Sequence, residues 1–128
     1  MSDFKNFNTT YFEFLEFIRI KSNENKGFIK FYKKNKILKK TNIKYIIKFW
    51  YSHITIPYYN NIINNDFDYF LNKDYSDEIN LVENEYKNNL MDSINFLKNN
   101  NVSDDDKEKF YNFVKNITIY SNNYFKKQ

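Results

Sequence analysis

The side chains that most often carry out chemistry are scarce in this chain of 128 residues. His53 is the only histidine, Gly27 is the only glycine, and cysteine is absent. These counts exclude glycine-rich phosphate loops, histidine or cysteine metal centres and thiol chemistry. Ser52 precedes His53, but adjacent residues on a helix do not face each other and make no nucleophile–base pair. We therefore expect a protein that is not an enzyme, without catalytic residues or cofactors, in which His53 is a partly buried helix residue.

Carboxylates offer the remaining route to chemistry, because their oxygens suit Ca²⁺ or Mg²⁺. The pattern of a calcium-binding EF-hand loop fails when it is counted from Asn64, since Tyr69 stands where glycine is needed and Tyr75 where glutamate is needed. The run Asp104–Asp106 sits at a predicted helix start. We predict no metal site and assign turn and capping roles to the acidic residues of the middle segment, which are Asp66, Asp68, Asp74, Asp77 and Glu78.

Lysine gives the sequence its clearest charge pattern. Residues 1–60 hold 12 basic and 4 acidic residues, residues 61–107 hold 4 and 11, and residues 108–128 hold 4 and 1. Nine lysines and no acidic residue lie between positions 26 and 48. We expect them to spread over a wide basic surface that flanks an apolar seam. The candidate nucleic-acid-binding residues of this surface are Lys30, Lys33, Lys34, Lys36, Lys39 and Lys40.

Three interpretations of the lysines stay open. Lysine neutralises phosphates without reading sequence, which favours sequence-independent nucleic-acid binding. However, the chain has 23 Asn, 19 Lys, one Arg and no Ala, a bias typical of A/T-rich coding, so a solvated helix face is the simpler explanation. The lack of arginine other than Arg19 also weighs against nucleic acid. Finally, basic and acidic faces of neighbouring copies can associate head to tail.

Aromatic residues make up 21% of the chain and must supply much of its core. Phe28, Phe31 and Trp50 lie among the lysines at helical spacing, which favours core packing over stacking on nucleic-acid bases. A second group has six rings within positions 58–75, more than a loop needs to anchor itself, and tyrosine is favoured at interfaces. We predict that this aromatic segment is a partner-binding surface formed by Tyr58, Tyr59, Phe67, Tyr69, Phe70 and Tyr75.

Apolar residues recur with helical periodicity along the chain and predict an all-α bundle of five or six helices in a single domain, 1–128. The inner faces that this periodicity predicts, helix by helix, are Tyr11, Phe14, Leu15 and Ile18; Phe28, Phe31, Tyr32 and Leu38; Ile43, Ile46, Ile47, Trp50 and Ile54; Ile79, Val82, Tyr86, Leu90, Ile94 and Leu97; and Phe110, Phe113, Val114, Ile117 and Tyr120 or Tyr124. Capping signals start helices at Thr10, at Thr41, at Ser76 or Asp77, and at Ser103. A further helix runs from the break at 22–27 to about Lys40. Pro57 kinks or ends the third helix, and a short helix follows from Tyr58 to about Asn64. Residues 65–76 form an ordered loop with aromatic and acidic side chains.

The N-terminal sequence lacks the pattern of a signal peptide, and no apolar run approaches the 18 residues of a membrane span. These features predict a soluble, intracellular protein.

Four short stretches of the middle of the chain carry a family resemblance. They are WY at 50–51, IPYY at 56–59, DFDYF at 66–70 and NKDYS at 72–76. Together they resemble small uncharacterised α-helical proteins of nucleocytoplasmic large DNA viruses. The resemblance implies a viral origin, with the host cytoplasm or the virion as location, and it transfers no catalytic residue.

These observations give two hypotheses for function. The first is a non-enzymatic protein-interaction or structural protein, such as a virion component or an assembly factor, whose partners are copies of itself or other virion or host proteins. The alternative is sequence-independent nucleic-acid binding through the lysine-rich surface, for packaging or protection.

Overall fold

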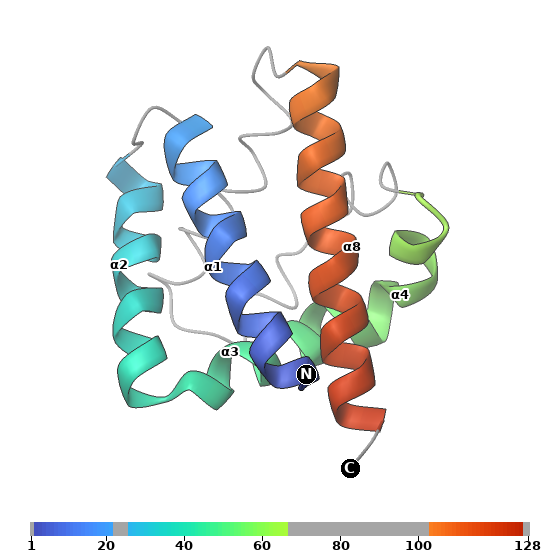
Figure 1. The fold of residues 1–128 in the computed structure, drawn as a ribbon, viewed down its shortest axis with the longest axis horizontal. Coiled ribbons are helices and arrows are strands. Elements are labelled where there is room, and N and C mark those ends of the chain that lie inside the picture. The colour runs from blue at the N-terminus through green and yellow to red at the C-terminus, as the bar shows by residue number, and fades with distance from the viewer. Residues whose placement is uncertain (1, 22–25, 67–102, 127–128) are drawn as a thin grey trace.

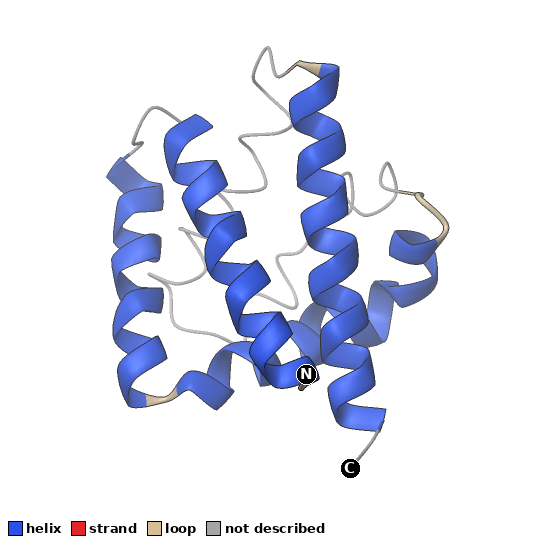
Figure 2. Cartoon of the chain, viewed as in Figure 1, coloured by secondary structure: helices blue, strands red, loops and turns tan. Residues whose placement is uncertain are grey.

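The computed structural model describes residues 2–21, 26–66 and 103–126, which are almost entirely helical, without a strand among them (Figure 2). The all-α class is therefore confirmed. The predicted helix from position 76 or 77 to about Lys98 and nearly all of the predicted loop 65–76 lie outside the described residues, so the number of helices stays a prediction. The helices are α1 (Asp3–Lys21), α2 (Lys26–Thr41), α3 (Ile43–Trp50), the π-helical η1 (Tyr51–Thr55), α4 (Ile56–Ile63) and α8 (Asp104–Lys126).

Helix α1 lies between α2 and α8 and packs against both (Figure 1). It runs antiparallel to α8, since Phe4 near its start meets Tyr124 near the end of α8, with ring centroids 5.5 Å apart. It also runs antiparallel to α2, since Tyr11 bonds Asn35 whereas Glu16, further along α1, bonds the earlier residue Tyr32. The continuous helical stretch of α3, η1 and α4 crosses one end of the layer formed by α1, α2 and α8 (Figure 1). All three parts of this stretch contact α8. This arrangement leaves one side of α2 without a neighbouring helix among the described elements.

Two predicted helix starts are wrong. Helix α1 begins at Asp3 rather than Thr10, because the Ser2 hydroxyl accepts a hydrogen bond from the Lys5 N–H at 3.1 Å and caps the helix earlier. Thr41 does not cap the third helix, since its hydroxyl donates to the Ile37 carbonyl within α2 at 2.9 Å. The cap at Ser103 is confirmed, because its hydroxyl accepts from the Asp106 N–H at 3.1 Å.

Aromatic rings fill the contact between α1 and α8, as expected for a chain without alanine. Phe14 meets Phe110 with ring centroids 5.1 Å apart, and Phe17 meets Phe113 at 5.6 Å. The predicted inner faces are largely confirmed. The buried apolar residues that the sequence pattern predicted are Tyr11, Phe14, Leu15, Ile18, Phe31, Ile46, Ile47, Trp50, Ile54, Phe110, Val114 and Ile117.

Polar side chains inside this core are paired across helices. The Trp50 indole N–H donates to the Thr118 hydroxyl at 3.1 Å. The Thr55 and Ser121 hydroxyls lie 2.6 Å apart, and Ser121 donates to the Thr118 carbonyl at 2.9 Å, so Thr55 is the donor to Ser121. These bonds connect the crossing helix to α8 at fixed positions, because an unpaired buried polar group is costly.

Pro57 does not end the helix in which it lies. A proline has no N–H, and in a regular α-helix its ring would clash with the carbonyl four residues earlier, here that of His53. The preceding turn widens into η1, in which the Ile56 N–H bonds the Tyr51 carbonyl five residues back. The widened turn accommodates the proline, and the helix continues as α4. It ends at Ile63, and two residues later Asn65 has a positive φ of 63°, which asparagine tolerates.

Candidate binding surface and groove

The lysines of α2 fall into two groups around the helix. At about 100° per residue, Lys30, Lys33 and Lys40 share one side, and all three are exposed. We call these three residues the outer lysine face. Ile37, with 61% of its surface exposed, lies in their midst. Lys36 and Lys39 are exposed on the side toward α1, and Lys34, which is half-buried, borders the outer lysine face.

The remaining side of α2 faces the core through Phe31, Asn35 and Leu38, and the lysines flank it. On α3, Lys44 and Lys48 are exposed as well. The basic surface is therefore divided between an open face and the rim of a groove.

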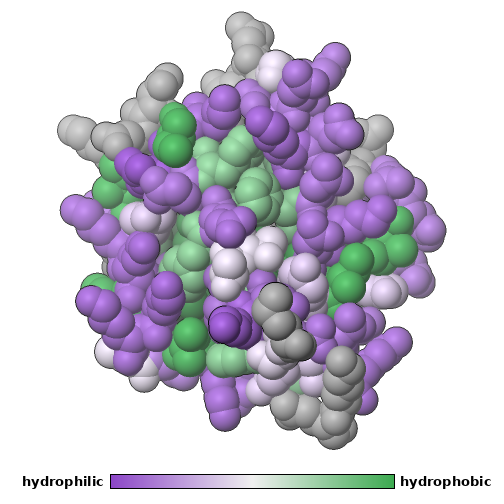
Figure 3. Space-filling model, viewed as in Figure 1, coloured by the Kyte–Doolittle hydropathy of each residue, from purple (hydrophilic) through white to green (hydrophobic). Residues whose placement is uncertain are grey.

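The groove lies between α1 and α2 and has a volume of about 600 Å³. It is called the α1–α2 groove below. In Figure 3, green apolar side chains lie between purple polar ones over the adjoining parts of α1 and α2. The residues that give the groove its chemistry are Asn8, Phe12, Glu13 and Glu16 of α1 and Lys36 and Lys39 of α2.

Lysines cover the apolar part of the groove. The Lys36 ammonium lies 5.7 Å from the Phe12 ring centroid and 5.3 Å from that of Tyr32, and the Lys39 ammonium lies 4.9 Å from Phe12. A cation over an aromatic face is attracted by the ring, weakly where water has access. The α2 wall of the groove is therefore positive, whereas the α1 wall carries the carboxylates of Glu13 and Glu16 and the ammonium group of Lys5.

Asn8, one of the residues that line the groove, carries a buried polar atom without a partner. Its side chain is 8% exposed, and its Nδ2 donates to the Phe4 carbonyl at 3.0 Å, which fixes the amide orientation. Its Oδ1 is buried and has no protein hydrogen-bond donor. Asn35, which is fully buried on α2, makes the equivalent bond to the Phe31 carbonyl, but its Oδ1 also accepts from the Tyr11 hydroxyl at 2.9 Å. Asn8 and Asn35 thus make the same bond through Nδ2, but only the Oδ1 of Asn35 accepts a hydrogen bond from the protein.

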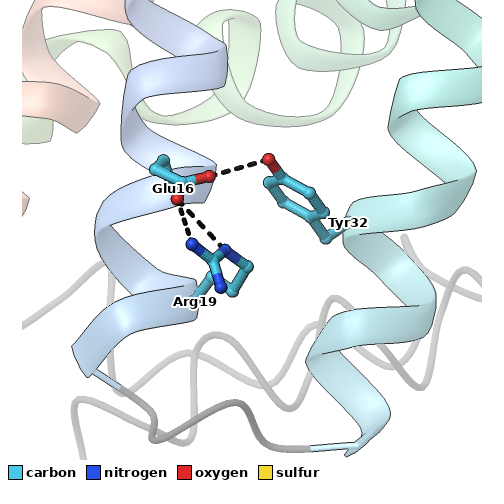
Figure 4. A network of polar contacts seen from close by, with 3 residues as sticks. All are labelled: Glu16, Arg19 and Tyr32. Carbon is cyan, nitrogen blue, oxygen red and sulfur yellow. Dashed lines mark hydrogen bonds and ion pairs between the residues drawn. The ribbon is translucent and has the colours of Figure 1, made fainter.

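A polar network joins the two walls next to these residues (Figure 4). The Tyr32 hydroxyl reaches from α2 to the Glu16 carboxylate on α1 at 2.7 Å, and the Arg19 guanidinium binds the other carboxylate oxygen. The hydrogen bond from Arg19, followed by that from Tyr32, lowers the pKa of Glu16 from 4.5 to about 2. Glu16 therefore stays ionised at neutral pH and holds the two helices together at this point.

The predicted partner surface changes in the part that the structure describes. Tyr58 is only 1% exposed because it faces the core from α4, so it cannot contact a partner. Tyr59 is half-buried. The other four rings, Phe67, Tyr69, Phe70 and Tyr75, lie outside the described residues.

The candidate catalytic and acidic residues in the described part of the chain make packing, turn and ion-pair contacts. His53 is half-buried as predicted, with its ring 4.6 Å from that of Phe49. Asp66 accepts from the Asn61 amide at 3.2 Å beyond the end of α4. Asp106 forms an ion pair with Lys21 at 3.4 Å. Over residues 2–21, 26–66 and 103–126, no three His, Cys, Asp or Glu side chains are grouped so that they could hold a metal ion.

Sequence reasoning found the lysines but missed the opposite wall of the groove. Asn8 is one of 23 asparagines, and no local signal marks it. Phe12 lies outside the apolar stripe predicted for α1. The spacing of Glu16 and Arg19, three residues apart on a helix, is the one signal that predicts a pair.

The described helices include none that is both long and apolar enough to cross a membrane. No family model, curated protein or solved structure matches the chain.

Proposed function

We propose that this chain is a non-enzymatic binding protein that holds the backbone of nucleic acid, without reading its sequence, through the lysines of α2 and α3. The observation that carries the proposal is the outer lysine face, in which three exposed lysines share one side of a helix and no acidic residue occurs from position 26 to 48. Lysine suits this function because it neutralises phosphates as a point charge and releases their counterions.

We favour nucleic-acid binding over protein binding because the candidate lysines are mostly exposed, whereas part of the candidate aromatic surface is buried. The six candidate lysines all belong to α2, and five of them are exposed. In the aromatic segment, by contrast, Tyr58 is buried in the core. The competing explanation for the lysines is a solvated helix face produced by A/T-rich coding, which predicts no binding at physiological salt.

The test is fluorescence anisotropy with a labelled mixed-sequence 20-mer, single- and double-stranded, near physiological salt. The informative variant replaces Lys30, Lys33 and Lys40 by Gln. A matched control replaces Lys109, Lys115 and Lys126 of α8, which changes the net charge equally. We expect the α2 variant to weaken binding of both probes and the α8 variant to leave it nearly unchanged. Absent binding, or an equal loss in both variants, contradicts the proposal.

A second candidate function is protein contact through α4 and the aromatic segment, as in a virion component or assembly factor of a large DNA virus. The observation that favours it is the start of α4, where Ile56 is 64% exposed and Tyr59 follows three residues later on the same side of the helix. Tyrosine is enriched at protein interfaces, and the exposed isoleucine beside it adds apolar area for a partner to cover.

Sedimentation of the wild type and of the variant Ile56→Asp with Tyr59→Ser tests whether the partner is a second copy. A wild-type oligomer that the variant loses supports the second function. A monomer at all concentrations excludes self-association through this surface.

A further inference from the structure

We propose that the α1–α2 groove binds one nucleotide unit, with its base over Phe12, a base N–H donating to Asn8, and its phosphate on Lys36 and Lys39. This inference deepens the proposed function and depends on it only for the class of ligand. The outer lysine face would hold backbone phosphates, whereas the groove would hold an unstacked base.

The hydrogen-bonding requirement comes from Asn8. Its Nδ2 is committed to the Phe4 carbonyl, and its buried Oδ1 has no protein donor. Buried polar atoms are nearly always paired, and an exception marks a place where another group can bind. Because Oδ1 is only an acceptor, the ligand must bring an N–H or O–H group. The amino or imino groups of the nucleobases supply such a donor.

The neighbouring residues require a flat apolar body and an anion. Phe12 follows Asn8 by four residues, so the two side chains lie on the same side of α1. The ammonium groups near the Phe12 ring make weak contacts and can move to a phosphate, which attracts them more strongly. A base stacked on an aromatic ring is a common mode of single-strand binding and tolerates every base.

The charges of the two walls fix the direction of the ligand and favour a nucleotide over an acidic peptide. The two carboxylates of Glu13 and Glu16 outnumber the single lysine, Lys5, on the α1 wall, whereas the charged residues of the α2 wall are Lys36 and Lys39. A nucleotide carries its negative charge at one end, which can face α2 while its neutral base faces α1. An acidic peptide has negative side chains on both sides and would place some against the glutamates. The volume of about 600 Å³ falls within the usual range for small-ligand pockets.

The test is calorimetric titration of the full chain with adenosine 5′-monophosphate and, separately, ribose 5-phosphate, which has the phosphate but no base. We expect Asn8→Ala to weaken binding of the nucleotide about tenfold, the value of one good hydrogen bond, and to leave ribose 5-phosphate unchanged. The double variant Lys36→Gln with Lys39→Gln should weaken both ligands. Asn6→Ala changes a half-buried asparagine two residues away, on the other side of α1; it is the matched control and should change neither.

The outcomes separate the groove from the outer lysine face. No binding of the nucleotide by the wild type, or equal binding by Asn8→Ala, overturns the nucleotide site, even where duplex DNA still binds through α2. Binding of a polyglutamate peptide that depends on Asn8, in place of the nucleotide, also overturns it. Nucleotide binding that depends on Asn8 supports the site, whether or not duplex DNA binds. Failure of duplex DNA to bind would refute only the proposed function. If Asn8→Ala does not fold, the double variant of Lys36 and Lys39 still tests the site, because both lysines are exposed and their replacement leaves the core intact.

Discussion

Replacing Asn8 and Asn35 separately by alanine should change the stability of the fold in opposite directions. Both asparagines are buried on helices, and each donates its Nδ2 to the carbonyl four residues earlier. Both variants lose this bond, remove the same atoms and gain helix propensity. The variants differ in what happens at Oδ1, where Asn8 has no protein donor and Asn35 accepts from Tyr11.

The size of the change in unfolding free energy follows from the hydrogen bonds that each variant loses. The lost bond to the carbonyl costs about 1 kcal/mol in each variant, and alanine in place of asparagine in a helix returns about 0.6 kcal/mol. Asn8→Ala also removes an unpaired buried acceptor, which relieves about 2 kcal/mol, so the variant should be more stable by about 1 to 2 kcal/mol. Asn35→Ala instead removes the acceptor of a buried hydroxyl, which costs about 2 kcal/mol, and should be less stable by roughly the same 2 kcal/mol.

The assay is thermal unfolding followed by circular dichroism at 222 nm, with urea unfolding as a check. At roughly 4 °C per kcal/mol for a domain of this size, the two variants should differ in Tm by about 15 °C. Similar losses of stability in both would refute the reasoning, because they would mean that Asn8 Oδ1 is already satisfied. The groove would then offer no unpaired acceptor to a ligand donor.

Two further predictions concern the polar contacts between helices. The pKa of Glu16 is lowered to about 2, so its ionised form stabilises the fold above about pH 4.5, and this contribution is lost as the pH falls toward 2. Glu16→Gln should therefore lower Tm at pH 7 more than at pH 2.5, and equal shifts at both pH values would argue against the network with Arg19 and Tyr32. Thr118→Val removes the acceptor of the Trp50 indole and should cost about 1–3 kcal/mol in urea unfolding followed by Trp50 fluorescence. A loss below about 0.5 kcal/mol would show that this bond does not stabilise the core.

The periodicity of apolar residues was enough to predict the all-α class and most of the buried faces. Ile46, Ile47 and Trp50 are buried as their spacing requires, because a helix can hide only one side. Helix starts were predicted less well. Ser2 caps α1 before the capping pattern at Thr10 is reached, since any Ser, Thr, Asp or Asn ahead of an apolar stripe can act as the cap.

The groove could not be predicted because it depends on which helix faces α1. The sequence carries no signal that places Lys36 and Lys39 beside Phe12, since this contact depends on the antiparallel packing of α1 against α2. The burial of Tyr58 has the same origin, because the widened turn before Pro57 determines which side of α4 faces the core. Such features arise from tertiary packing, which local patterns do not encode.

The salt dependence of nucleic-acid binding tests the central claim most directly. For each phosphate neutralised on a single strand, the slope of log K against log salt becomes more negative by about 0.7. If Lys30, Lys33 and Lys40 each contact a phosphate, their replacement by Gln should flatten the slope by about 2, whereas the α8 control should leave it unchanged. A slope that is the same in the wild type and both variants would contradict phosphate binding by the outer lysine face.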